Sequence, residues 1–448
     1  MSDSQRRSGS RAAALALAAT LWLAIGTGAL AQTGAREPVR LGDLYGQVQR
    51  ANPRLVAARS LGDAAAARVS SATRPPDPQL QLGFMNYELP GLTPMATLGM
   101  TQLQLMQMLP LAGKLSLAGR AASAQASAAS ERARDVSWEL RAQTAMAFYD
   151  LYATDRGLDV ARETLLLLHG VAQTTEAMYR VGDGRQADVL RAQVEIARMA
   201  ADTIRMVAMR QTMAARLNAL RDRDADAPVG EPLLPRFPDS LPPRTWLDSV
   251  ARDGRPMLRA GTADVRAAEA SERLARREIV PDLQLGVQYG QRAGEMGGTE
   301  RMGSLMVGAS VPVFARSRQL RMREEAGAMT RMARADLAAM RAETRARVGE
   351  VSASLVRGRD LARLYRTTVL PQAEAAARSA QASYRVGGVD FMTLLDDRMT
   401  VNRYRTELYA LEADEGKAWA ELEMLVGREL LDANAVAVPA AVAERGAR

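Results

Sequence analysis

Two kinds of hydrophobic periodicity alternate along the chain, and the first predicts long helices. Apolar residues recur every seven positions, as at Leu151, Leu158 and Leu165. Seven-residue spacing is typical of coiled-coil packing, and the many alanines allow neighbouring helices to approach closely. We therefore expect very long helices over about 114–180 and 316–385, each followed by a shorter return helix.

The second kind of periodicity is strict alternation, which predicts strands with one apolar and one polar face. It occurs within 77–110 and within 281–312. Leucine, valine and aromatic residues opposite glutamine and glycine are typical of a transmembrane β-barrel with a wet interior, although a soluble sandwich would give the same alternation in any one strand. Four strands cannot close a barrel, so several subunits must contribute. The apolar positions include Leu80, Leu82, Phe84, Leu103, Leu105, Leu283, Leu285, Val287, Tyr289, Leu305, Val307, Ala309 and Val311.

The second half of the chain repeats the first. The stretch AMYRVGDGRQADVL from Ala177 is answered 205 residues later by ASYRVGGVDFMTLL from Ala382, and RPPDPQLQLG is answered by REIVPDLQLG. Such long-range similarity indicates an internal tandem duplication, and each unit opens with a predicted helix of about thirty residues, Leu41–Thr73 or Arg244–Glu278. The expected organisation is a first repeat over 32–221, a proline-rich connector over 222–243, a second repeat over 244–431 and a C-terminal tail over 432–448.

Residues 1–31 predict a secretory signal peptide. Arg6, Arg7 and Arg11 precede the apolar stretch Ala12–Ile25, and small residues at Ala29–Ala31 form a cleavage site. An uncleaved membrane anchor is the alternative. No other segment approaches the roughly 18 apolar residues of a spanning helix, so we expect an exported protein that enters a membrane only through strands.

Composition argues against several classes of function. The chain has no cysteine, and His169 is its only histidine, which excludes thiolate sites, Ser-His-Asp triads and histidine zinc sites. The stretch Ala112–Lys114 lacks the earlier glycine of a phosphate loop. A formal charge of +8 is dispersed among acidic residues on helices, without a basic patch for nucleic acid. We expect no enzyme activity, no cofactor and no nucleic-acid partner.

The duplicated unit, the strand pairs between helices, the signal peptide and the Tyr-Arg-Val-Gly turns together resemble the TolC-like outer membrane efflux protein family. The resemblance implies a mainly α fold with a small β part, in which three chains contribute four strands each to one outer-membrane β-barrel. It also implies a long coiled-coil α-barrel that extends into the periplasm. Such a homotrimer is a passive exit duct of a tripartite efflux system, and its partners are a periplasmic adaptor, an inner-membrane pump and outer-membrane lipid.

The resemblance further implies two sets of functional residues at the periplasmic tips. Tyr384 and Asp188 match positions that the family links across a closed tip, and Asp396 matches one of its two constricting aspartates. Thr393 occupies the other aspartate position and Val389 the position of a gate arginine, so the constriction is expected to be less acidic. The residues expected to dock the adaptor are Tyr179, Arg180, Val181, Gly182, Leu190, Arg385, Val386, Gly387 and Leu395.

The first strand pair is rich in methionine, namely Met85, Met95, Met100, Met106 and Met108. Thioether ligands favour Cu(I) and Ag(I), and the stretches FMNYELPG and MLPLAGKL resemble the copper- and heavy-metal-associated branch of the family. Methionine is also a common packing residue, so metal coordination and packing both remain open. A general drug duct, the outer-membrane component of a type I protein secretion system and a soluble periplasmic coiled-coil scaffold are the alternative functions.

Overall fold

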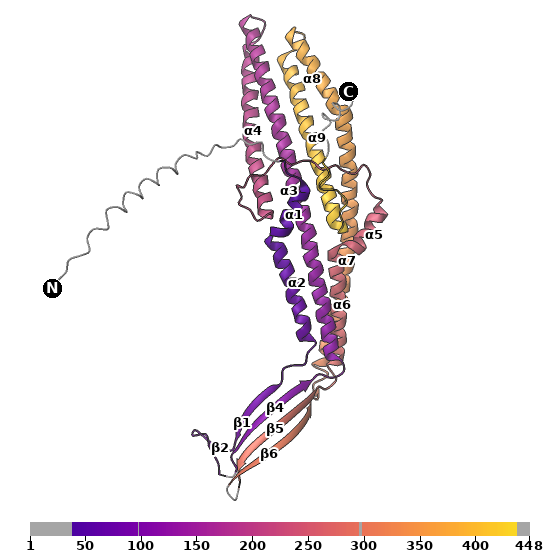
Figure 1. Cartoon of the computed structure of the whole chain (residues 1–448). Helices are drawn as coiled ribbons and strands as arrows, with labels where there is room; N and C mark the ends of the chain where they lie inside the picture. Colours follow the sequence, from indigo (N-terminus) through magenta and orange to yellow (C-terminus); the bar gives the residue numbers. More distant parts are fainter. Residues whose placement is uncertain (1–37, 97, 295–297, 437–448) are drawn as a thin grey trace, which may run out of the picture. The chain divides into compact units, whose positions relative to one another are not determined.

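The computed structural model describes residues 38–96, 98–294 and 298–436. The predicted signal peptide and residues 437–448 of the predicted tail lie outside the described residues. The described chain is mainly helical, with one four-stranded sheet and one small hairpin (Figure 1). The helices are α1 (Leu41–Ala51), α2 (Pro53–Ala72), α3 (Lys114–Arg180), α4 (Gln186–Leu220), α5 (Arg244–Gly254), α6 (Pro256–Arg277), α7 (Gln319–Leu364), a π-helical segment η1 (Tyr365–Val369), α8 (Leu370–Arg385) and α9 (Phe391–Val426). The strands are β1 (Gln79–Met85), β2 (Tyr87–Glu88), β3 (Thr93–Pro94), β4 (Met100–Leu109), β5 (Leu283–Ala293) and β6 (Thr299–Ala309).

None of the helices in the described ranges has a stretch that is both long and apolar enough to span a membrane.

Each half begins with two short helices, where the sequence pattern predicted one helix of about thirty residues. A proline causes the break in both halves, because Pro53 begins α2 and Pro256 begins α6. The preceding residues, Asn52 and Arg255, are extended, since the proline ring disfavours helical geometry just before it. Asn52 is buried at the first break, where its side-chain amide donates to the carbonyl of Leu220 at 2.8 Å.

The long helices of the two halves differ. Helix α3 runs unbroken for 67 residues from Lys114 to Arg180, as predicted. Its counterpart was expected to be continuous over 316–385, but it begins at Gln319 and changes to π geometry between α7 and α8. Pro371, in the first turn of α8, explains the change. It cannot donate a backbone hydrogen bond and its ring crowds the preceding turn, which a local π turn accommodates.

Helix α3 packs against α2, α4, α6 and α9, and therefore lies at the centre of the helical part (Figure 1). Leu151 and Leu158 of its seven-residue series are 0% and 4% exposed. A side chain at Gly416 of α9 would place its Cβ 2.3 Å from the ring of Tyr149, so only glycine permits this approach of α9 to α3. The predicted close helix packing is confirmed.

The connector over 222–243 contains no helix and packs along the helices of both halves. It forms one parallel bridge, between Val39 and Pro232, and one antiparallel bridge, between Pro235 and Val436. The ring of Phe237 lies 6.2 Å from that of Tyr149, and both join a core built from α1, α3, α4 and α9. The two repeats therefore share one core and do not form separate domains.

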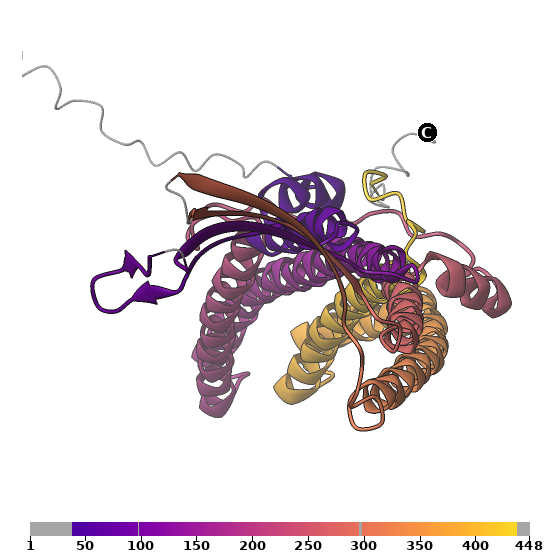
Figure 2. The same ribbon diagram turned by 90° about the horizontal axis from the view of Figure 1, so that it is seen from below.

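The sheet has the strand order β1-β4-β5-β6, with every neighbouring pair antiparallel. Figure 2 shows these strands as one curved layer. The pairing of β4 with β5 joins the strand pair of the first repeat to that of the second. Equivalent faces are kept in register, because Leu105 lies opposite both Leu80 and Val287, and Val287 lies opposite Leu305.

Lys114 joins the start of α3 to the segment that leads into β5. Its Nζ donates to Oδ1 of Asp282 and to the carbonyl of Val280, both at 2.8 Å, and lies 3.6 Å from the carboxylate of Glu278. The lysine is 5% exposed, and a buried ammonium requires such partners. Gly113, with φ +72°, turns the chain from strand to helix. This stretch therefore has a structural role at the junction of the repeats.

Candidate functional site

The apolar face of the sheet is uncovered in the described chain. The four residues of one cross-strand row, Leu80, Leu105, Val287 and Leu305, are 67, 48, 59 and 76% exposed. Neighbouring rows continue the same apolar face through Leu82, Leu103 and Tyr289. A contiguous exposed apolar surface of this kind marks contact with a membrane or with another protein.

The opposite face of the sheet carries amides, glycines and thioethers. Gln288 donates to Gln102 across β4 and β5, and Arg292 pairs with Glu300 at 2.7 Å. The register places four of the five predicted methionines on this face, and Met95 lies outside it, after β3. Two methionines of β6 that the sequence analysis did not select also belong to it, although the alternation around them could have identified them. The methionines of this face are Met85, Met100, Met106, Met108, Met302 and Met306.

The two Tyr-Arg-Val-Gly turns have the same structure. Gly182 and Gly387 have φ values of +88° and +72°. Their N–H groups donate to the carbonyls of Tyr179 and Tyr384, each at 3.1 Å. No atom lies within 4 Å of a Cβ built on either glycine, so a side chain would not be crowded there. Glycine is favoured at these positions because the backbone is left-handed. The repeated motif therefore encodes two identical reversals between helices.

Eight of the nine predicted docking residues are exposed at these turns and one is not. Tyr179, Val181, Leu190 and Val386 are 45, 73, 54 and 84% exposed. Leu395 is 6% exposed, because it packs in a core cluster between the two hairpins. It cannot present its side chain to a partner in this conformation, which corrects its selection from the sequence. The remaining exposed residues are Arg180, Gly182, Arg385 and Gly387.

The structure does not pair Tyr384 with Asp188. The hydroxyl of Tyr384 lies 3.0 Å from that of Thr175 on α3, and both residues are buried. Asp188 lies in the first turn of α4, 3.9 Å from Arg191. The buried link between the hairpins therefore uses Thr175. Sequence patterns do not single out this residue, because a threonine within a long helix usually bonds only its own backbone.

Thr393 and Asp396 have different roles at the start of α9. Asp390 caps this helix by accepting from the N–H and the hydroxyl of Thr393 at 2.9 and 2.6 Å. These two hydrogen bonds hold the pKa of Asp390 below its usual range. Asp396 is exposed, whereas Val389 packs against the core cluster between the hairpins. Of the two positions expected to constrict a pore, only Asp396 carries a charge.

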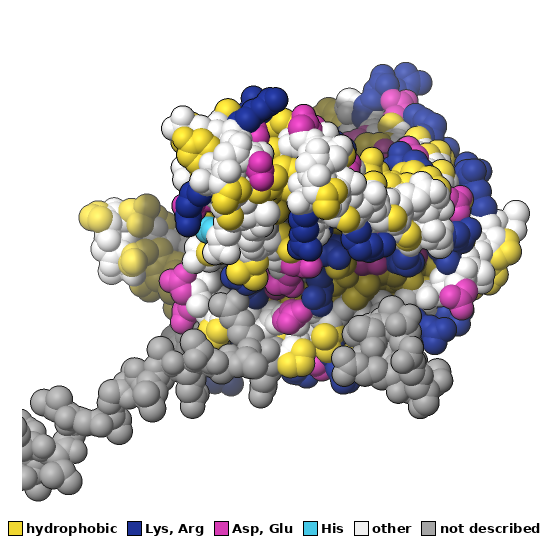
Figure 3. All heavy atoms as spheres, turned by 90° about the horizontal axis from the view of Figure 1, so that it is seen from above, with side chains coloured by type: hydrophobic (Ala, Val, Ile, Leu, Met, Phe, Trp, Pro, Cys, Tyr) yellow, Lys and Arg dark blue, Asp and Glu magenta, His cyan; other side chains and the backbone are white. Residues whose placement is uncertain are grey.

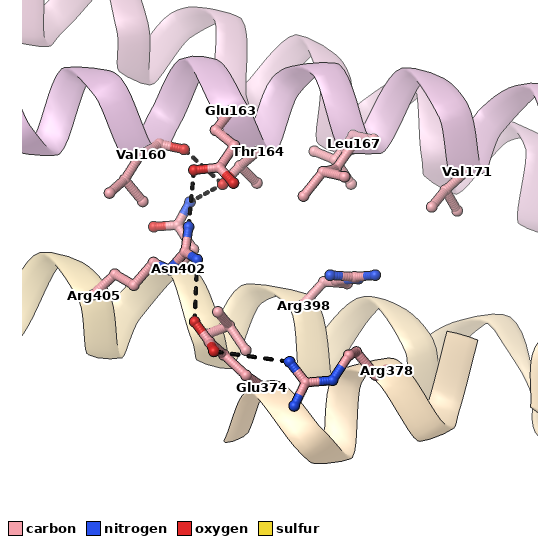
Figure 4. Close-up of a pocket in the computed structure, with 12 residues that line it drawn as sticks. Val160, Glu163, Thr164, Leu167, Val171, Glu374, Arg378, Arg398, Asn402 and Arg405 are labelled. Atoms are coloured by element: carbon pink, nitrogen blue, oxygen red, sulfur yellow. Dashed lines mark hydrogen bonds and ion pairs between the residues drawn. The ribbon is translucent and has the colours of Figure 1, made fainter. Parts of the chain in front are cut away.

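A cavity of about 230 Å³ separates α3 from α8 and α9 beyond this cluster (Figure 4). Asn402 donates to the hydroxyl of Thr164 across it at 2.9 Å. Arg405 bonds both Glu163 of α3, at 2.8 Å, and Glu374 of α8, at 3.1 Å. The two hairpins are thus joined here by hydrogen bonds and ion pairs across the cavity. Sequence reasoning had selected none of these residues.

Charges on the helices are mixed in sign. Figure 3 shows basic and acidic side chains interspersed on the face turned to the viewer. Many ion pairs join residues three or four positions apart on one helix, such as Arg180 with Glu176 at 2.7 Å. Exposed pairs of this kind contribute little to stability. Within the described chain, the excess of basic over acidic residues is therefore spread over solvated helix surfaces and does not form a basic patch.

The comparisons with known proteins agree with this architecture. The profile of the family described as outer membrane efflux protein matches residues 44–221 and 247–428, once for each repeat. No curated protein sequence matches the chain significantly. Among solved structures, CusC, described as forming a transmembrane channel, is 17% identical, with a TM-score of 0.76 over 89% of this chain and 96% of that one.

Two further solved structures share the fold. The outer membrane protein VceC of Vibrio cholerae is 18% identical, with a TM-score of 0.75 over 87% of this chain and 96% of that one. The open-state MtrE outer membrane channel of Neisseria gonorrhoeae is 18% identical, with a TM-score of 0.74 over 88% and 90%. The two matched segments confirm the internal duplication, and the chain belongs to the outer membrane efflux protein family.

Proposed function

We propose that this chain forms a homotrimeric exit duct in the outer membrane, which passively conducts substrate received from a periplasmic adaptor and an inner-membrane pump. The observation that carries the proposal is an uncovered apolar sheet on the same chain as two identical, exposed helical turns. A soluble scaffold would have no use for such a sheet. Neither a catalytic arrangement nor a cofactor is needed for a passive duct.

The sheet is suited to completion by other copies of the chain. Its edge strands β1 and β6 have one unpaired side each, and an exposed strand edge pairs readily with another strand. Three copies would supply three such sheets to one closed barrel, with the apolar rows towards lipid and the amide-rich face towards water.

Helix α4 carries a second uncovered surface that supports trimer formation. Leu190, Val194 and Ile204 are 54, 63 and 71% exposed. Together with exposed alanines they follow the alternating three- and four-residue spacing of a coiled-coil seam, at Leu190, Val194, Ala197, Ala201, Ile204 and Ala208. The exposed apolar residues Leu361 and Leu364 of α7 offer a matching surface on the neighbouring copy.

The exposed turns are the proposed adaptor-docking tips. Each presents an arginine and a valine beside its glycine, and all of these side chains point away from the chain's own core. Inside the tip of the trimer, Asp396 would form one ring of carboxylates, which admits cations readily. Asp188 and Thr393 would lie near this ring, and Tyr384 would hold the second hairpin against the first.

The tips are tested by Gly182→Val combined with Gly387→Val. A β-branched residue at positive φ is strained, so both turns should deform and adaptor-dependent export should be lost. The measurements are dye export from whole cells and crosslinking to the adaptor. Gly170→Val is the matched control, because Gly170 has open space around it and lies within α3.

The trimer and its amount in the outer membrane should stay unchanged in the double variant, since the turns lie outside the core clusters. Normal export in an assembled double variant would contradict the assignment of the tips. A chain that needs no detergent to remain in solution would contradict the membrane duct itself.

A further inference from the structure

Two methionines meet above a glycine on the amide-rich face of the sheet. Met106 of β4 and Met306 of β6 both lie opposite Gly286 of β5. A Cβ built on this glycine would lie 3.4 Å from Cγ of Met106 and 3.3 Å from Cε of Met306. Two side chains from strands that are not neighbours therefore converge in the space that glycine leaves empty.

A related arrangement lies four residues further along β5, where the β4 residue opposite the glycine is Gln102 and Met100 approaches the glycine diagonally, from the position opposite Arg292. Gly290 lies opposite Met302 of β6, and its Cβ would lie 2.9 Å from the sulfur of Met100. Met85 of β1 lies directly opposite Met100 and extends the series. Two glycines, each flanked by thioethers from β4 and β6, thus form a row on one face of the sheet.

The donor set of this face selects soft cations. Thioether sulfur is a neutral, polarizable ligand that suits Cu(I) and, by the same softness, Ag(I). Hard divalent cations prefer carboxylate oxygens, and the carboxylate that the strands place here, on Glu300, is already paired with Arg292. Within the described ranges, no cluster of three or more His, Asp or Glu residues could hold a metal ion.

Packing alone does not account for the arrangement. Methionine fills gaps in apolar cores, but Met106 and Met306 are partly exposed on a face shared with glutamines. Nε2 of Gln104 lies 4.0 Å from the sulfur of Met306, which orients this thioether within the polar face. A Cβ at Gly286 would be in tight contact with both methionines, at 3.3 and 3.4 Å, so a larger residue would push their side chains apart.

We propose that Met106 and Met306 form a transit site for a soft monovalent cation, Cu(I) or Ag(I), above Gly286. Met100 and Met302 form a second site of the same kind above Gly290. The inference rests on the proposed function, which places this face inside the duct. Two neutral ligands bind a cation weakly enough to release it, as conduction requires. Efflux of soft metal ions is then the substrate class that the sheet supports.

The test measures Ag(I) binding to the purified, detergent-solubilised full-length trimer by equilibrium dialysis in chloride-free buffer. Met106→Leu combined with Met306→Leu keeps the side-chain volume but removes both sulfurs, so it should lose one Ag(I) per chain. Gly286→Ala keeps both sulfurs and inserts a Cβ between them, and should weaken this site about tenfold.

Two variants serve as controls. Gly303→Ala lies in the same sheet but opposite Tyr289 on the apolar face, with no atom within 4 Å of its Cβ. Met209→Leu removes an exposed sulfur from α4. Both should bind Ag(I) as the unaltered trimer does.

Unchanged Ag(I) binding by the double methionine variant, or no binding by the unaltered trimer, would overturn the inference. If the double variant fails to assemble, Ag(I) binding by Gly286→Ala is the deciding measurement, and unchanged binding by that variant would overturn the inference. Adaptor-dependent dye export needs no silver, so a trimer that exports dye but does not bind Ag(I) would refute the metal site and leave the duct intact.

Discussion

The return helices α4 and α9 occupy equivalent places in the two repeats, yet their environments differ. Leu190 of α4 and Leu395 of α9 stand at the same position of the repeated motif and are 54% and 6% exposed. Helix α9 packs against α3, α7 and α8, whereas α4 packs chiefly against α3. Duplication has therefore preserved the local turn and changed what covers it, so that this face of α4 is uncovered in the described chain.

The C-terminal ends of the same two helices differ in another way. Equivalent residues are buried in both helices, but one is an amide and the other a carboxyl group. Asn218 and Glu423 are 205 residues apart, and both are buried. Asn218 donates to two backbone carbonyls of the connector, at 3.0 and 2.8 Å. Glu423 accepts from two backbone N–H groups after α9, at 2.7 and 2.8 Å. Each side chain fixes the loop that follows its helix, but only one of them can ionise.

The largest expected effect comes from placing a charge at the two equivalent leucines. Leu395→Asp would bury an unpaired carboxylate and should lower the free energy of unfolding by about 3–5 kcal/mol. Leu190→Asp should leave the fold of each chain intact and prevent the trimer from assembling. Urea unfolding and size-exclusion chromatography with light scattering measure the two effects. Equal behaviour of the two variants would contradict the different roles of α4 and α9.

A charge on the sheet should have the next largest effect, and it should be equal in the two repeats. Leu82 of β1 and Leu285 of β5 both lie on the apolar face. Replacing either with lysine should destabilise the membrane-inserted state by about 2–4 kcal/mol if the face contacts lipid. Gln81→Lys, on the opposite face, is the control. Urea titration in lipid vesicles measures the difference, and equal loss in the control would mean that the faces are inverted.

The ionisable end of α9 predicts a pH dependence that the end of α4 lacks. Burial raises the pKa of Glu423 above its ordinary value of 4.5. The folded state then holds the proton more tightly than the unfolded chain. The contribution of Glu423 to the free energy of unfolding is therefore fully present below about pH 4.5, and it is lost as the pH rises through the pKa of Glu423 in the folded state.

Glu423→Gln should remove this dependence of the free energy of unfolding on pH. The contribution that is lost amounts to about 1.4 kcal/mol for each unit by which burial raises the pKa. Asn218→Ala should leave the pH dependence of the free energy of unfolding unchanged, because the amide of Asn218 does not ionise, even though the variant loses the hydrogen bonds to the two carbonyls. Thermal unfolding between pH 4 and 8 measures both, with the exposed Glu350→Gln as the control. A slope that persists in Glu423→Gln would assign it to another group.

The smallest expected effect concerns the two tyrosines of the repeated motif. Tyr384 makes a buried hydrogen bond to Thr175, and its counterpart Tyr179 is exposed. Tyr384→Phe should weaken the contact between the hairpins by about 1 kcal/mol, which corresponds to about a fivefold higher open probability in planar bilayers. Tyr179→Phe should change nothing. The same conductance from both variants would show that the link to Thr175 does not hold the tip closed.

The candidate site was predictable where it depends on local geometry. The two glycine turns, the start and end of α3 and the alternation of the strands follow from residues close together in the sequence. The partner of Tyr384 was not predictable, because Thr175 is 209 residues away in the chain. The convergence of Met106 with Met306 likewise depends on the pairing of strands from different repeats.

The sequence by itself determined the duplication, the periodicity of each segment and the breaks that proline and glycine impose, because these act through the backbone of a few neighbouring residues. It determined the faces of the strands for the same reason. Only the tertiary structure decided which copy of each repeated residue is buried, since burial depends on helices and strands distant in sequence. The tertiary structure therefore separates Leu395 from Leu190 and Tyr384 from Tyr179, although each pair arises from the same motif.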